Sequence, residues 1–144
     1  MNNTIRNTIG VFSGLIVSII IIIIGITINP EWVRYDGIYD PFFPFQRWQR
    51  LIKNASNWFF IALLISGGIA SIIGGIITAI IVKHAKTAYS IFLGFILYII
   101  GLLDSWINSE HPIWYNIAIL FILFPFSWIG GKIVDSIFNK FNKK

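Results

Sequence analysis

Four stretches of this sequence are long and apolar enough to cross a lipid bilayer, and this feature constrains the fold most. They cover approximately residues 8–28, 58–82, 88–107 and 113–137. A helix needs about 20 apolar residues to span a hydrocarbon core of roughly 30 Å. The stretches lack the alternating pattern of barrel strands, and a helix satisfies its own backbone hydrogen bonds in lipid. The sequence therefore predicts an all-α membrane protein, a four-transmembrane-helix bundle that forms a single domain over residues 1–144.

The composition supports this class of protein and excludes several others. Hydrophobic residues make up 56% of the chain and charged residues only 12%, whereas a soluble domain has about 25% charged residues. So little charge could not cover a surface exposed to water. The chain has no cysteine, which excludes disulfide scaffolds, thiolate metal sites and cysteine nucleophiles. The net charge of +5 is spread over the ends and connections, which indicates membrane orientation rather than a nucleic-acid partner.

Basic residues gather on one side of the predicted bundle. The set on that side is Arg6, Lys83, Lys86, Lys132, Lys140, Lys143 and Lys144. The connection over residues 105–112 has no lysine or arginine and carries Glu110 instead. Because cytoplasmic segments of membrane proteins carry an excess of lysine and arginine, both termini are predicted to be cytoplasmic. We interpret the chain as a multi-pass protein of the cytoplasmic (inner) membrane, with membrane lipids as its immediate partners.

The connection between the first two stretches, about residues 29–57, is unusually aromatic for a loop. Its aromatic residues are Trp32, Tyr35, Tyr39, Phe42, Phe43, Phe45 and Trp48. In its second half, apolar side chains recur at helical spacing opposite Arg47, Arg50 and Lys53. This pattern predicts an aromatic-rich outer loop containing a short amphipathic helix at the headgroup level. The helix is a lid over a cavity, a docking surface or only an interfacial anchor, and Arg47 and Trp48 are its candidate functional residues.

Small residues recur at four-residue spacing on the first two predicted helices. The set that we assign to helix packing is Gly10, Gly14, Gly67, Ser71 and Gly75. In lipid, helices associate where small side chains let their backbones approach each other. These faces are therefore expected to hold the bundle together or to mediate self-association. A glycine-lined groove that holds a lipid tail is the functional alternative.

Ionisable residues are rare within the predicted spans, and the one candidate cluster lies around the connection between the third and fourth stretches. Asp104, Glu110 and His111 could bind a metal or exchange protons, and Trp114 follows them. One histidine with two carboxylates is a sparse ligand set. Pro112 disfavours helical geometry at His111, which predicts a tight turn whose imidazole meets water without a partner. We expect no catalytic, cofactor-binding or metal-binding residue here, and at most a functional surface.

Three segments resemble a known family. These are the small-residue-rich helix over residues 67–79, the turn Glu110–Tyr115 with its His-Pro-x-Trp-aromatic order, and Phe124–Gly131, where a proline precedes a pair of glycines. In these features the chain resembles a family of small, uncharacterised four-span bacterial inner-membrane proteins. The resemblance implies a four-helix bundle in a bacterial membrane, and it implies no reaction.

Three classes of function fit these observations. The first, which we favour, is a non-catalytic helix bundle that acts through association with itself as a homo-oligomer, with lipid or with a larger membrane complex. The second is a small oligomeric transporter or channel with a glycine-lined path, or one opened at Pro125, which lacks an N–H donor and is expected to kink or locally open its helix. The third is a membrane enzyme that uses Asp104, Glu110 and His111. A wide hydrated cavity would favour the second class, and convergence of these three side chains the third.

The predicted orientation can be tested directly because the chain has no native cysteine. We expect a Ser109→Cys variant to react with a membrane-impermeant maleimide added to intact cells. An Ala85→Cys variant is expected to react only after the membrane is permeabilised, because residue 85 lies beside the basic residues that face the cytoplasm. The reverse labelling pattern would place both termini outside.

Overall fold

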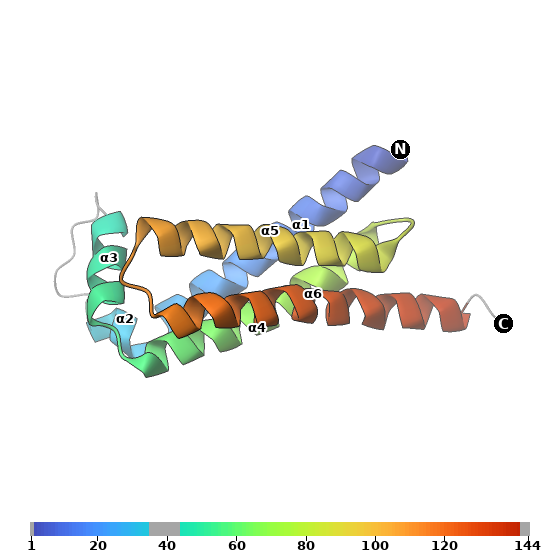
Figure 1. Ribbon diagram of the computed structural model, residues 1–144. Coiled ribbons are helices and arrows are strands. Elements are labelled where there is room, and N and C mark those ends of the chain that lie inside the picture. The colour runs from blue at the N-terminus through green and yellow to red at the C-terminus, as the bar shows by residue number, and fades with distance from the viewer. Residues whose placement is uncertain (1, 35–43, 142–144) are drawn as a thin grey trace.

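The computed structural model describes residues 2–34 and 44–141, which form six helices and no strand (Figure 1). The long helices are α1 (Asn3–Thr27), α4 (Asn57–Ile81), α5 (Lys86–Ile107) and α6 (Ile113–Phe141), and the short ones are α2 (Pro30–Arg34) and α3 (Pro44–Asn54). Four of the helices are long and apolar enough to cross a membrane. The predicted all-α four-helix bundle is confirmed, and the chain is a multi-pass helical membrane protein.

The bundle has two distinct ends (Figure 1). At one end lie α2, α3 and the turn between α5 and α6, and we call this the α3 end. At the opposite end, which we call the terminal end, lie the start of α1, the end of α6 and the turn between α4 and α5. Consequently α4 and α6 run in the same direction, from the α3 end to the terminal end.

The long helices extend beyond the apolar stretches that predicted them. α1 begins at Asn3 rather than near Thr8, and α6 continues to Phe141, past the end of its apolar stretch. Hydropathy marks only the part of a helix that suits hydrocarbon, whereas the helix itself continues until its free backbone groups find other partners. At the start of α1 the side chain of Asn2 accepts a hydrogen bond from the backbone N–H of Thr4 (3.3 Å), which is a favourable N-terminal cap.

α3 is the amphipathic helix that the sequence predicts, and it lies across the end of the bundle (Figure 1). Its apolar side is buried, since Leu51 and Ile52 pack in one cluster with Phe59 and Phe60 at the start of α4. Its polar side, which includes Arg50, is exposed. The aromatic residues predicted in the loop between Tyr35 and Phe43 lie outside the described residues.

α2 is a helix of five residues that the sequence pattern did not predict. It begins with a proline, which suits the first turn of a helix. Glu31 accepts hydrogen bonds from the backbone N–H (2.9 Å) and the hydroxyl of Ser56, just before α4. The guanidinium of Arg47 lies 3.8 Å from the ring centroid of Trp32 and donates a hydrogen bond to the carbonyl of the same residue (3.0 Å). α2 is thereby connected to both α3 and α4.

α4 is the central helix, in contact with α1, α5 and α6, whereas α1 and α5 touch each other only locally. The contact with α1 is a close approach of backbones at glycine. A Cβ atom on Gly14 would lie 2.6 Å from the carbonyl oxygen of Gly74, and one on Gly74 would lie 2.8 Å from that of Gly14. The hydroxyl of Thr78 donates a hydrogen bond to the carbonyl of Gly10 (3.2 Å). This geometry requires glycine, because a larger residue would force the backbones apart.

The contact between α4 and α6 is built in the same way. A Cβ atom on Gly75 would lie 2.5 Å from the carbonyl oxygen of Ser127. From the other side, a Cβ atom on Gly130 would lie against the carbonyl of Ile72. Gly75 of α4 and Gly130 of α6 therefore belong to one interface, whereas Gly131 of α6 packs against Thr87 and Ser90 of α5.

The remaining small residues assigned to packing lie on the same side of α4. A Cβ atom on Gly67 would be 3.2 Å from the side chain of Leu123. Ser71 is fully buried. The structure therefore buries Gly10, Gly14, Gly67, Ser71 and Gly75 within one copy of the chain, and self-association is not needed to cover them.

Pro125 does not interrupt α6, which is helical on both sides of it (Figure 1). The sequence predicted a kink or a local opening at this position, and the helix continues through it. α5 packs closely on this segment: a Cβ atom on Gly94 would lie 3.0 Å from the carbonyl oxygen of Leu123 and 3.2 Å from the Cα of Phe124. Tight packing by a neighbouring helix supports a helix that contains proline, as is common in membrane proteins.

At the terminal end of the bundle, basic side chains cap the C-terminus of α4. The ammonium group of Lys86 donates hydrogen bonds to the carbonyls of Ala79 (2.7 Å) and Val82 (2.8 Å). Arg6 donates a hydrogen bond from Nε to the carbonyl of Ile81 (2.5 Å). Cations at the C-terminus of a helix satisfy free carbonyls and interact favourably with its dipole. Two of the residues that predict the orientation therefore also hold α1 and α5 against α4.

We predict that Gly75→Ala destabilises the protein, because the added methyl group meets the backbone of Ser127 and α6 would have to move. Overpacking of this kind costs about 1–3 kcal/mol. Gly101→Ala is the matched control, since its methyl group would meet only the ends of two side chains, Ile119 at 3.2 Å and Leu123 at 3.9 Å. Thermal unfolding in detergent should show a lower Tm for Gly75→Ala and an unchanged or higher Tm for Gly101→Ala. Equal Tm values for the two variants would contradict the close contact.

Candidate functional site

Asp104, in the last turn of α5, is the centre of a polar cluster at the α3 end. Its Oδ1 atom accepts hydrogen bonds from the indole Nε1 of Trp48 (2.9 Å) and from the side-chain amide of Asn108 (2.8 Å). Trp48 belongs to α3, and Asn108 is the C-terminal cap of α5. The carboxylate of Asp104 therefore links the amphipathic helix to the bundle.

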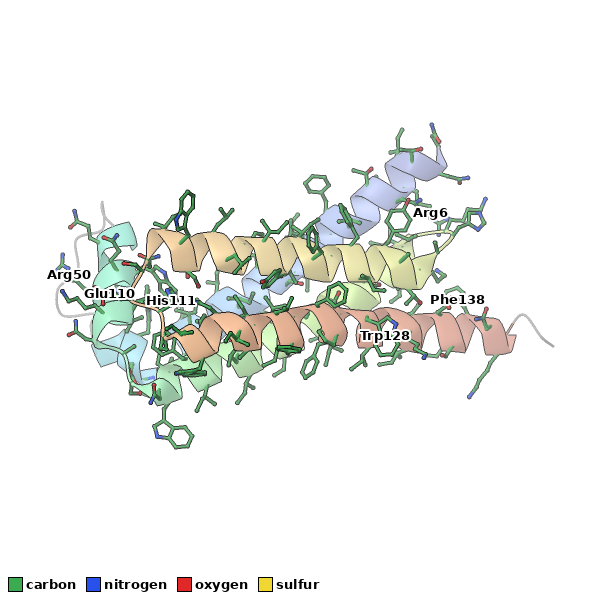
Figure 2. All side chains as sticks on the ribbon, in the orientation of Figure 1. Arg6, Arg50, Glu110, His111, Trp128 and Phe138 are labelled. Carbon is green, nitrogen blue, oxygen red and sulfur yellow. The ribbon has the colours of Figure 1, made fainter. Side chains whose placement is uncertain are left out.

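His111 lies in the turn between α5 and α6, and its side chain is buried, with 5% of the residue exposed (Figure 2). Its Nδ1 lies 2.8 Å from the carbonyl oxygen of Asn108, and its Nε2 lies 3.3 Å from Oδ2 of Asp104. The predicted position in a turn is right, but the prediction that the imidazole meets water without a partner is wrong. Pro112 sets only the backbone geometry of the preceding residue, whereas the fold of the turn over α5 decides where the ring lies.

The surroundings of His111 favour its protonated form. Both ring nitrogens face oxygen acceptors, and only the imidazolium has a hydrogen to donate from each of them. Burial by itself lowers the pKa of His111. The contact with the Asp104 carboxylate and the hydrogen bond to Asn108 outweigh burial, so the pKa is raised above its ordinary value of 6.5.

Aromatic side chains enclose the imidazole. The ring of Tyr115 stacks on His111 with centroids 5.3 Å apart and planes 23° apart, and Phe60 approaches it at 5.7 Å. Trp114 lies farther out, where it packs edge-on against Phe60 at 6.3 Å and is itself exposed. Such packing holds the ring of His111 in one orientation.

Glu110 does not join this cluster. Its side chain is exposed, and it borders a shallow surface shared with Lys53 of α3. Within residues 2–34 and 44–141, no group of three histidine, aspartate or glutamate side chains lies close enough to hold a metal ion. Of the residues singled out from the sequence, Asp104, His111 and Trp48 are brought together, while Glu110, Trp114 and Arg47 point to other contacts.

The cluster is not arranged as an acid–base pair that faces a substrate. A catalytic histidine uses one ring nitrogen to contact an orienting group and keeps the other for the reacting molecule. In this protein Nδ1 of His111 is taken by the carbonyl of Asn108, Nε2 faces Oδ2 of Asp104 at 3.3 Å, and the ring is buried. The arrangement favours a structural role, in which His111 joins the α5–α6 turn to the carboxylate that holds α3.

An apolar groove of about 290 Å³ lies beside the cluster, between α1 and α5. We call it the α1–α5 groove, and its lining includes Ile19, Ile23, Ile100, Ile119, Trp48 and Asp104. Among the described residues that line it, Asp104 is the only charged one. Ile23 and Ile100 are also exposed on the outside of the bundle. The groove therefore opens sideways, toward whatever surrounds the helices, and is bounded at the α3 end by Trp48 and Asp104.

The contacts of this site differ in how far the sequence could have predicted them. Asn108 was missed, although it follows Asp104 by four residues, the spacing of neighbours on a helix. The contact between Trp48 and Asp104 joins residues 56 positions apart, and the walls of the groove come from separate helices. No local pattern reveals contacts of that kind.

Comparison with family models, curated proteins and solved structures finds no match to this chain. The resemblance to small four-span bacterial membrane proteins therefore stays an expectation, and the site is interpreted from its geometry alone.

We predict that His111→Gln removes a pH-dependent part of the stability. Because the pKa of His111 is raised in the folded protein, its contribution is complete below the unfolded pKa of about 6.5 and is lost as pH rises through the folded pKa. The wild type should therefore exceed the variant in stability more at acidic than at alkaline pH, by on the order of 1 kcal/mol or less. Thermal unfolding in detergent at several pH values measures this difference.

His84→Gln is the control for this experiment, since His84 is the other histidine of the chain and is exposed in the α4–α5 turn. Its pH profile should follow that of the wild type. If the profiles of wild type and His111→Gln run parallel, the coupling between His111 and Asp104 does not contribute to stability.

Proposed function

We propose that this chain is a non-catalytic protein of a bacterial cytoplasmic membrane that holds a membrane lipid by its acyl chain. The observation that carries the proposal is the α1–α5 groove, which is apolar, about 290 Å³ in volume and closed at one end by Trp48 and Asp104. Its volume is close to the lower limit for small-ligand sites, roughly 300 Å³. Because the groove opens sideways between two membrane-crossing helices, it faces the hydrocarbon chains of the lipids in a bilayer.

The dimensions of the groove support an acyl chain as its occupant. Its lining on α1 extends from Ile19 to Ile26, which is roughly 10 Å at 1.5 Å per residue. One leaflet contributes about half of a hydrocarbon core of roughly 30 Å. The groove therefore has a depth comparable to a single leaflet, and its polar end lies level with the amphipathic helix, where lipid headgroups lie.

The distribution of charge supports an orientation with the terminal end in the cytoplasm. Arg6, Lys83, Lys86, Lys132 and Lys140 lie on helices or turns toward that end, and Figure 2 shows Arg6 there and Arg50, Glu110 and His111 at the opposite end. By the positive-inside rule the terminal end is cytoplasmic. The α1–α5 groove then belongs to the outer leaflet, and α3 lies on the outer surface.

The alternatives have less support in this geometry. The α1–α5 groove occupies the half of the bundle near α3, and a second apolar groove of about 310 Å³ lies between the same helices in the other half. Between the two, Leu93 of α5 packs against α1 at Gly14, so the grooves do not form one hydrated path for a transporter. An enzyme that uses Asp104, Glu110 and His111 would need all three side chains in reach of a substrate, and Glu110 lies outside the cluster.

We predict that Ile100→Trp reduces lipid retention, because Ile100 lines the groove and a larger side chain there fills the space of the acyl chain. Ile99→Trp is the matched control: Ile99 is adjacent on α5 and similarly exposed (40%, against 43% for Ile100), but it does not line the groove. Native mass spectrometry of protein extracted from phospholipid vesicles should show one retained lipid on the wild type and on Ile99→Trp.

For Ile100→Trp the retained fraction should fall several-fold. Equal retention by the two tryptophan variants would mean that the lipids bind elsewhere on the bundle. An absence of retained lipid on the wild type would remove the proposed function altogether.

A further inference from the structure

The α1–α5 groove has a charged group at its α3 end as well as an apolar interior. Asp104 lines the groove, and 35% of its side chain is exposed. A charge at the end of an apolar site is unfavourable unless it has hydrogen-bond partners. The distribution of partners over its two oxygens therefore shows what else the carboxylate can accept.

One oxygen of Asp104 is saturated by the protein and the other is not. Oδ1 accepts hydrogen bonds from Trp48 and Asn108, at 2.9 and 2.8 Å. Oδ2 has one neighbouring donor group among the described residues, the Nε2 of His111 at 3.3 Å. A carboxylate has about four acceptor positions. Oδ2 can therefore accept a further hydrogen bond.

A lipid whose chain lies in the groove would bring its headgroup to this oxygen. Asp104 lies in the last turn of α5, beside α3, and an amphipathic helix with exposed cations such as Arg50 and Lys53 lies at the level of the headgroups. The charged group that the groove lining offers to a headgroup is a carboxylate. A positively charged hydrogen-bond donor fits this carboxylate, whereas an anionic group does not.

We propose that the α1–α5 groove selects a phospholipid whose headgroup carries an ammonium N–H donor, as ethanolamine does, over an anionic phospholipid such as one with a glycerol headgroup. This inference rests on the proposed function. The ammonium would donate a hydrogen bond to Oδ2 of Asp104, while the acyl chain occupies the apolar part of the groove.

Other charges at the α3 end act in the opposite sense. Arg50 and Lys53 are exposed cations on α3 that attract anionic lipid, and protonated His111 is a third. The exposed cations are screened by salt over a distance of about 8–10 Å, and His111 is already paired with Asp104 and Asn108. The carboxylate instead makes direct contact at the edge of an apolar site, where the effective dielectric constant is low and the interaction is stronger.

The test uses the full chain in vesicles of ethanolamine and glycerol phospholipids, mixed in equal amounts and with identical acyl chains. After extraction, native mass spectrometry measures both the amount and the identity of the retained lipid. The wild type should retain the ethanolamine lipid several-fold over its share of the vesicle. Asp104→Asn should lose this preference among the lipids that it retains, because asparagine keeps an oxygen for Trp48 and Asn108 but loses the charge.

A second vesicle, of ethanolamine and choline phospholipids, needs no variant and therefore does not depend on the folding of Asp104→Asn. Choline carries the positive charge but no N–H donor, so the wild type should still prefer ethanolamine. Equal retention of choline and ethanolamine lipids, a preference for the glycerol lipid, or retention at the vesicle ratio would each overturn the selectivity and leave the lipid-binding function standing. Absence of any retained lipid would instead overturn the proposed function itself.

Discussion

The arrangement of this protein depends on the close approach of α4 to two other helices. In lipid, helices gain nothing from hiding apolar side chains from water, so they associate through close packing and hydrogen bonds. Gly74 and Gly75 are adjacent in α4, and successive residues of a helix point about 100° apart. Gly74 therefore meets α1 while Gly75 meets α6. A pair of glycines thus provides α4 with two contact faces at one level of the membrane.

The groove is a consequence of that arrangement. Because α1 and α6 pack on separate faces of α4, α1 is held mainly by α4. It meets α5 near Gly14 and Leu93, and again where the side-chain amide of Asn7 donates a hydrogen bond to the hydroxyl of Tyr89 (2.9 Å). On the α3 side of this contact the two helices leave a space that their isoleucine side chains line but do not fill. The same glycines that stabilise the bundle therefore also determine where this groove lies.

Asp104 connects the groove with the amphipathic helix. Its carboxylate holds Trp48 of α3, Asn108 at the end of α5, and His111 in the following turn. Trp48 and Asp104 also form the closed end of the groove. A molecule at this end of the groove would therefore lie against the two residues that attach α3 to the bundle.

The sequence by itself determined the all-α class, the four membrane-crossing helices, the amphipathic helix at α3, and the small residues that allow close packing. These depend on local composition and periodicity, because a backbone in lipid has to satisfy its hydrogen bonds within each helix. Only the tertiary structure decided that α6 stays helical through Pro125, that His111 is buried against Asp104, and that Trp48 reaches Asp104 across the bundle. The tertiary structure also placed the side chain of Glu110 outside the cluster that its sequence neighbour His111 joins. The physical reason is that burial and pairing of these side chains depend on which helices become neighbours, and that choice is made by contacts between residues far apart in the chain.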